Sequence, residues 1–260
     1  MMTLRPGQRI LNIPAIGVKT SRRAVAAGGN GLLNNLIAYW KLDEASGDAL
    51  DAHTNGLTLA DGNTVTNAAG KVYTLARQYT AANSEFHTRT GDDALLSTGD
   101  VDYTLATWLY LDSKSSTMYG PAKWIVGTGA REYAITYITA TDRFRWLVSQ
   151  DGTTSTVLLA NSFGAVSTAT WYLVICWHDA SGNQLGISVN ATVDTASYSS
   201  GSADSTTPFA ISPDAGRWNG RIGPVAMWKS AAGGGGVLTA AQRSALWNGG
   251  AGLPYASFTV

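Results

Sequence analysis

The glutamates of this chain are its first candidates for catalytic acids. The sequence contains three of them, Glu44, Glu85 and Glu132. Hydrolysis of a glycosidic bond needs two carboxylates at one cleft, and alternating strand positions supply such a pair because every second side chain points to the same face. None of the three has an acid two or four positions away on a predicted strand; Asp48 follows Glu44 by four positions, but in a predicted turn. The sequence therefore predicts no catalytic residue and a protein that is not an enzyme.

Other residue types that could carry chemistry are equally dispersed. Asp100 and Asp102 alternate, but they precede a predicted strand and are interpreted as turn residues. Cys176 is the single cysteine and alternates with apolar residues, so we expect a buried, unreactive thiol. Neither a Gly-x-Ser-x-Gly motif nor a phosphate-binding loop occurs, and the glycines at 233–236 are interpreted as a linker. The three histidines, His53, His87 and His178, lie far apart in the sequence. They therefore lack the His-x-His or His-x-x-His spacing that is typical of a metal site.

The elements that must position these residues are predicted to be short antiparallel strands. Segments rich in β-branched and aromatic residues alternate with Gly, Ser, Asn and Asp turns, which is typical of a two-sheet jelly roll or related sandwich. Chains of this length form such sandwiches as one domain, which we expect over residues 34–260. The predicted strands are 36–42, 71–79, 84–88, 103–112, 122–129, 133–139, 143–149, 156–161, 170–179, 185–191 and 218–228.

One short helix is predicted near the C-terminus. Thr239 followed three residues later by Gln242 matches a capping box, and Asn248-Gly249-Gly250 supplies residues that tolerate the left-handed stop. Pro224, in the strand before it, is expected at an edge or a bulge because it lacks an amide hydrogen. One helix face is expected to pack on a sheet, across the edge of the last strand, through Leu238, Ala241, Ala245 and Leu246.

The charges divide the chain into a basic arm and an acidic body. The formal net charge is zero, yet residues 1–30 carry five basic and no acidic residues, so the remainder carries −5. This balance argues against nucleic acid and membrane partners, and Asn12, Pro14 and Gly17 interrupt the apolar run that a signal peptide needs. Residues 1–33 are interpreted as an extended anchoring arm that binds a partner through Arg5, Arg9, Ile10, Leu11, Ile13, Ile16, Val18, Arg22 and Arg23.

Three segments, at 36–59, 99–112 and 217–250, resemble the start, middle and end of laminin-G-like domains of the concanavalin A-like lectin/glucanase superfamily. The resemblance rests on Tyr-Trp-x-Leu-x-Glu-x-x-Gly near the start and on Trp-x-Gly-x-Ile, Leu-Thr-x-x-Gln-Arg and Trp-Asn-x-Gly near the end. It implies a jelly roll that serves as lectin, adhesion module, enzyme appendage or virion component. Relatives often place a calcium-binding Asp where this chain has Gly223, so no cofactor is expected, although calcium on Asp43, Asp51 and Asp61 stays open.

Three functions follow as hypotheses. The first is a structural accessory of a bacteriophage particle, such as a capsid decoration, head-fibre or tail component, located at the virion surface. The arm would bind other virion proteins, and we expect a homo-oligomer. The second is a lectin-like adhesion module for cell-surface glycans, and the third, least supported, is a glycoside hydrolase. Five tryptophans could stack on a sugar or fill the core, Trp124, Trp146, Trp171, Trp177 and Trp218.

Overall fold

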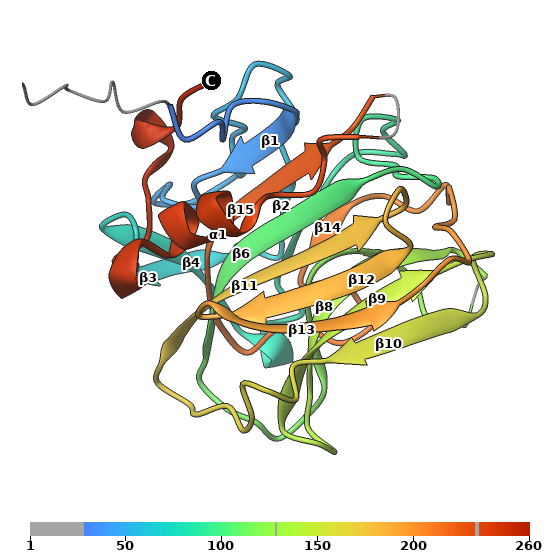
Figure 1. Cartoon of the computed structure of the whole chain (residues 1–260). Coiled ribbons are helices and arrows are strands. Elements are labelled where there is room, and N and C mark those ends of the chain that lie inside the picture. Colours follow the sequence, from blue (N-terminus) through green and yellow to red (C-terminus); the bar gives the residue numbers. More distant parts are fainter. Residues whose placement is uncertain (1–28, 128, 232–233) are drawn as a thin grey trace, which may run out of the picture.

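The protein is a sandwich of two antiparallel sheets (Figure 1). The computed structural model describes residues 29–127, 129–231 and 234–260. Within these residues one sheet has eight strands and the other seven. The predicted all-β fold class with one short C-terminal helix is confirmed. The predicted boundary between arm and domain at residue 33 stays a prediction, and most of the arm lies outside the described residues.

The eight-stranded sheet carries the longest strands. Seven of its strands form a path from β13 to β3. The eighth strand, β1, pairs with one half of β15, on the edge of β15 whose other half pairs with β4. Both edges of β15 are therefore hydrogen-bonded, on one side to β6 and on the other to β4 and β1. In order, the strands are β13 (Thr192–Ser197), β12 (Gln184–Val189), β11 (Trp171–Asp179), β6 (Tyr103–Leu111), β15 (Gly220–Lys229), β4 (Leu75–Tyr79) and β3 (Thr66–Ala69), with β1 (Leu36–Trp40).

The seven-stranded sheet packs its inner face on the first sheet and leaves part of its outer face to solvent. Its strand order is β10 (Ser155–Leu159), β9 (Arg143–Ser149), β8 (Arg131–Ile138), β7 (Met118–Trp124), β14 (Ala210–Ile211), β5 (Phe86–Thr88) and β2 (Ala60–Gly62). The described helices are α1 (Ala240–Trp247) and the 3-10 turns η1 (Ala81–Asn83), η2 (Asn248–Gly250) and η3 (Tyr255–Ser257). None of these helices could span a lipid bilayer.

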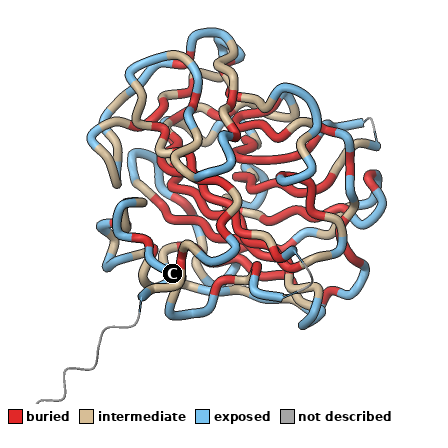
Figure 2. Tube along the Cα trace, turned by 90° about the horizontal axis from the view of Figure 1, so that it is seen from above, coloured by how far each residue is buried: buried red, intermediate tan, exposed pale blue. Residues whose placement is uncertain are grey.

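The core lies between the sheets, where Figure 2 shows buried strands crossing the molecule inside a rim of exposed loops. Alternation in β6 sends Leu105 and Leu109 into this core and Ala106 and Trp108 to the opposite face of the same strand. Cys176 lies in the core as predicted, and burial raises the pKa of its thiol. Each fully buried large side chain stabilises the fold by about 1.5–3 kcal/mol.

Most predicted strands are present, but four strands were missed and one was misplaced. β2 and β14 have three and two residues, too few for a periodic pattern, and β3 and β13 are polar. The strand predicted at 122–129 is β7, which begins at Met118 and ends at Trp124. Gly127, with a φ of 82°, is in the left-handed region that ends a strand.

Pro224 lies at a bulge rather than at an edge. The register of β15 against β6 shifts between Ile222 and Val225. At the same point the partner on the other side changes from β4 to β1. The missing amide of Pro224 therefore costs no ladder bond in the interior of the sheet.

Helix α1 packs on the outer face of the eight-stranded sheet. Thr239 and Gln242 form the predicted capping box, and Asn248 takes the left-handed conformation at the C-cap. The predicted contact across the edge of the last strand is wrong, because both edges of β15 are paired; Leu246 packs instead with Trp108 and other outer-face residues. Ala241, predicted on the buried face, is exposed.

The chain ends join α1 on this outer face. Leu32, the penultimate residue of the predicted arm, is fully buried, and its carbonyl accepts a 2.8 Å hydrogen bond from the Trp228 indole. The Leu33 amide donates to the Thr259 carbonyl at 3.0 Å. The first described residues and the C-terminal segment therefore form one cover with α1 (Figure 1).

Replacing Leu246 with Asp should destabilise the sandwich by about 2–5 kcal/mol, because a carboxylate would be placed in the apolar contact of α1 with the sheet. Ala241→Asp is the matched control on the exposed side of the same helix, with an expected change within about 0.5 kcal/mol. Chemical denaturation measures both free energies of unfolding. Equal stability of the two variants would show that α1 is not docked.

Candidate functional site

An open groove lies on the outer face of the seven-stranded sheet. It has a volume of about 350 Å³ and runs over β5, β14 and β7. Apolar side chains make most of its surface, and two threonines, an aspartate and an arginine supply polar groups. The lining residues are Phe86, Thr88, Trp124, Ile125, Val126, Thr207, Pro208, Ala210, Pro213, Asp214, Ala215 and Arg217.

The floor of the groove is explained by the strand register. Ala60 pairs with Thr88, Thr88 with Ala210, Ala210 with Ala122, and Ala122 with Ala134. Directly paired residues point to the same face, so this small-residue row crosses five strands. Of this row, Thr88 and Ala210 line the groove, whereas Ala122 and Ala134 are fully buried. The short side chains of Thr88 and Ala210 leave the sheet surface low there, and larger neighbours form the walls.

Aromatic rings with arginines above them form the two walls. On one wall the Arg217 guanidinium lies over the Phe86 ring, 4.5 Å from its centroid. On the other side, the Arg131 guanidinium lies 5.6 Å from the centroid of the Trp124 ring. Such cation–π contacts fix the direction of each arginine.

The rims of the groove differ in chemistry. Ile125, 42% exposed, and Val126, 54% exposed, form an apolar rim after β7. On the opposite rim Arg217 donates to the Ser212 carbonyl at 2.6 Å and to Asp214 at 3.2 Å, and the Asp214 side chain is 94% exposed. The groove can therefore hold a ligand with an apolar face and polar edges.

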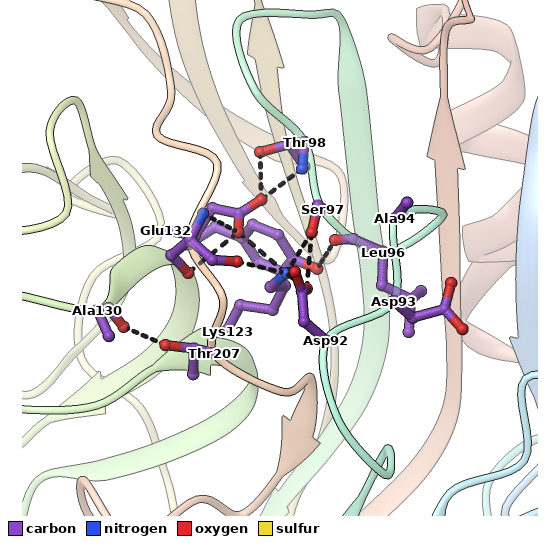
Figure 3. A network of polar contacts seen from close by, with 12 residues as sticks. Asp92, Asp93, Ala94, Leu96, Ser97, Thr98, Lys123, Ala130, Glu132 and Thr207 are labelled. Carbon is purple, nitrogen blue, oxygen red and sulfur yellow. Dashed lines mark hydrogen bonds and ion pairs between the residues drawn. The ribbon is translucent and has the colours of Figure 1, made fainter.

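Glu132, a candidate catalytic acid by residue type, is held in a buried polar network (Figure 3). The Lys123–Trp124 step of β7 faces Tyr133 and Arg131, with a register shift that leaves Glu132 between them. One carboxylate oxygen accepts bonds from the Thr98 amide and hydroxyl. The other accepts from the Ser205 amide and hydroxyl, at 3.2 and 3.3 Å, and lies 3.2 Å from the Lys123 ammonium.

Lys123 ties this network together. Its ammonium, also fully buried, donates to Asp92 at 2.7 Å, to the Ser97 hydroxyl at 2.5 Å and to the Ser205 carbonyl at 3.1 Å. Burial raises the pKa of Glu132, and Lys123 and the hydrogen bonds from Thr98 and Ser205 oppose that rise. Both oxygens of Glu132 are engaged, so the network holds loops 92–98 and 202–205 against the sheet.

The other two glutamates are also engaged in local structure. Glu85 accepts from the Thr80 amide at 2.6 Å and from the Asn83 side chain at 3.0 Å around η1. Glu44 accepts from the Leu50 amide at 2.8 Å and lies 3.6 Å from Arg77. None of the three glutamates is among the residues that line the groove.

Two of the three aspartates considered for calcium, Asp51 and Asp61, bind backbone amides. Asp51 accepts from the amides of Tyr39, His53 and Leu57. Asp61 accepts from the Val65 amide. Across the described ranges, no three His, Cys, Asp or Glu residues gather in an arrangement that could hold a metal ion.

The five tryptophans separate into different environments. Trp146 and Trp218 lie in the core between the sheets. Trp171 and Trp177 lie on the eight-stranded sheet, and Trp124 lines the groove. Sequence alternation did not distinguish these faces, and it missed Phe86 and Arg217, which come together only through the fold. The predicted arm residues, Arg5 to Arg23, lie outside the described residues.

Replacing Lys123 with Met should lower the free energy of unfolding by about 3–5 kcal/mol, because Glu132 and Asp92 would lose their buried counter-charge. Lys114→Met is the control: Lys114 pairs with Asp142 at 2.8 Å, but both side chains are about a third exposed. That loss should be about 1 kcal/mol or less. Equal losses in a denaturant titration would contradict a stabilising role for the network.

Comparison with known structures identifies the same architecture. Domain 4 of AbnA, a GH43 extracellular arabinanase from Geobacillus stearothermophilus solved with arabinotriose, aligns with a TM-score of 0.51 and 14% identity over 80% of this chain and 96% of that domain. The botulinum neurotoxin serotype D ligand binding domain, solved with N-acetylneuraminic acid, aligns with a TM-score of 0.58 and 9% identity over 86% of this chain. The aligned region spans 52% of the neurotoxin chain.

At these identities the two structures establish the fold. Comparison with curated protein sequences found no match. The sequence profile of the Concanavalin A-like lectin/glucanases superfamily matches residues 82–234, more than half of the chain. This region contains β5 to β15 and every residue that lines the groove. The chain belongs to the Concanavalin A-like lectin/glucanases superfamily.

Proposed function

We propose that the protein is a non-enzymatic, lectin-like module that binds a carbohydrate in the groove on the seven-stranded sheet. The observation that carries this proposal is the low floor of Thr88 and Ala210 between the Phe86 and Trp124 walls, with Arg217 and Asp214 at the rim. The exposed apolar rim residues Ile125 and Val126 contact the C–H faces of a sugar, and the charged rim groups bind its hydroxyls.

The relatives support a carbohydrate ligand without identifying it. The arabinanase domain was solved with arabinotriose and the neurotoxin domain with N-acetylneuraminic acid. These two sugars differ in size and charge, so the fold accommodates different glycans. The ligand of this chain must be argued from its own residues.

Hydrolysis is not expected of this groove because its described lining residues include no carboxylate pair. Asp214 is the single acidic residue among the groove-lining residues described. Glycosidic hydrolysis needs two carboxylates, about 5–9.5 Å apart. Glu132, which has the buried environment of a catalytic acid, uses both oxygens within its network.

Asp214→Ala and Val126→Ala should each weaken glycan binding several-fold, because each removes a rim contact of about 1 kcal/mol without disturbing the core. Val193→Ala on β13 is the control, since Val193 is 41% exposed on the other sheet. A glycan array selects the ligand and isothermal titration calorimetry measures its affinity. Equal affinity of all variants, or recovery of a cleaved ligand after incubation, would contradict the proposal.

A phage virion accessory is the second candidate and is compatible with glycan binding. The five basic residues and the apolar residues before residue 30 support it as an anchor for a larger assembly. Gly29 and Leu32 lie on the covered outer face of the eight-stranded sheet, on the side of the sandwich opposite the groove. A protein anchored at that face would present its groove outward.

Deletion of residues 2–28 should leave a folded sandwich that no longer joins its oligomer or parent particle. The cut preserves Asn30 and Leu32, which bind the C-terminal segment and Trp228. Thermal unfolding and size-exclusion chromatography with light scattering provide the readouts, and Ile13→Asp with Ile16→Asp should reproduce the assembly defect in the full chain. Unchanged assembly of the deleted protein would exclude the anchoring role.

A further inference from the structure

We infer that the glycan is anionic, and that three arginines beside the groove bind its carboxylate, sulfate or phosphate groups. This inference rests on the proposed carbohydrate-binding function and specifies its ligand class. The three are Arg131 on β8 and Arg143 and Arg145 on β9, and we call them the arginine face.

The register places the arginine face on the same side of the sheet as the groove. Arg145 alternates with Leu147, and Leu147 pairs with Ala134 of the small-residue row. Arg143 is two residues from Arg145, about 7 Å along the strand. Arg131 pairs with Trp124, whose side chain lines the groove.

Two aromatic residues connect the arginine face to the groove. The Trp124 ring contacts the groove and lies below Arg131. Tyr119 interacts with Arg145. The Tyr119 ring also lies close to Gly216, in the loop of the groove rim, because a Cβ atom at Gly216 would be 3.0 Å from that ring. A ligand chain leaving the groove therefore crosses a buried cluster of Tyr119, Trp124 and Leu147 before it reaches the arginines.

The charges of the arginine face lack carboxylate partners, which sets them apart from four other cations of the described residues. Arg131 donates to the Thr153 carbonyl at 2.6 Å, Arg143 to the Asp142 carbonyl at 3.0 Å, and Arg145 to the Thr136 hydroxyl at 2.9 Å. None of the three is in an ion pair with a described carboxylate. In contrast, four other basic side chains form ion pairs with carboxylates: Arg89, Lys114, Lys123 and Arg217.

Neutral acceptors orient these guanidinium groups but do not cancel their charge. Acidic side chains nearby are already engaged: Asp142 with Lys114 and Tyr137, and Asp151 with the amides of Thr153 and Thr154. Half-buried, oriented arginines bind anionic oxygens more strongly than mobile surface lysines do. The arginine face spans roughly 20 Å, so it fits an oligosaccharide with several charges rather than one acidic sugar.

The test compares acidic oligosaccharides with their carboxyl-reduced, neutral counterparts, using oligogalacturonate, hyaluronan fragments and sialylated glycans. Calorimetry at low salt should show that the acidic forms bind at least about tenfold more tightly than the neutral forms. This difference in affinity should decrease at moderate salt. Arg131→Gln with Arg145→Gln should remove the preference. The matched control is Arg221→Gln with Arg243→Gln, because those arginines, like Arg131, lie over aromatic rings without an ion pair, but against the eight-stranded sheet.

The outcomes separate the inference from the proposed function. Equal binding of acidic and neutral forms would overturn the anionic ligand and keep the groove as a glycan site. Absence of binding to both forms and to every glycan of an array would overturn both. Binding of a single-stranded DNA oligonucleotide as tight as that of the acidic glycans would also overturn the inference, because the arginine face would then recognise charge alone. Thermal unfolding verifies that every variant is folded.

Discussion

Burial of both faces of the eight-stranded sheet is the constraint on which the rest of the structure depends. Strands β6, β11 and β15 carry apolar side chains toward the core and also away from it. Leaving the second face in water would cost about 25 cal/mol for each Å² of apolar surface. Helix α1, the C-terminal segment and the residues after Gly29 cover it, and this cover draws the described chain ends to one side of the sandwich.

The seven-stranded sheet meets a different requirement. Its inner face closes the core, and its outer face combines small residues, buried aromatic rings and oriented arginines. The network of Lys123 and Glu132 holds loops 92–98 and 202–205 against β7 and β8. A groove built on the outer face of a hydrogen-bonded sheet is largely preorganised, so binding a ligand there loses little conformational entropy.

The sequence predicted what depends on local pattern. Alternation revealed the long strands, and the Thr239–Gln242 capping box revealed α1, because both signals lie within a few residues. The groove floor could not be predicted, since Thr88 and Ala210 are neighbours only through the pairing of distant strands. The extra residue at the Glu132 bulge also reverses the alternation of β8, so no simple period would have placed Arg131 beside Trp124.

The central claim is that the outer face of the seven-stranded sheet binds the ligand, and NMR mapping of an acidic oligosaccharide titration tests it most directly. The account predicts chemical-shift changes concentrated at Thr88, Trp124, Ala210 and Arg145. A different hollow, of about 390 Å³ and lined by hydroxyl-bearing residues such as Ser197 and Tyr198, lies at the edge formed by β10 and β13. Changes confined to that edge, or to the cover formed by α1, would contradict the account.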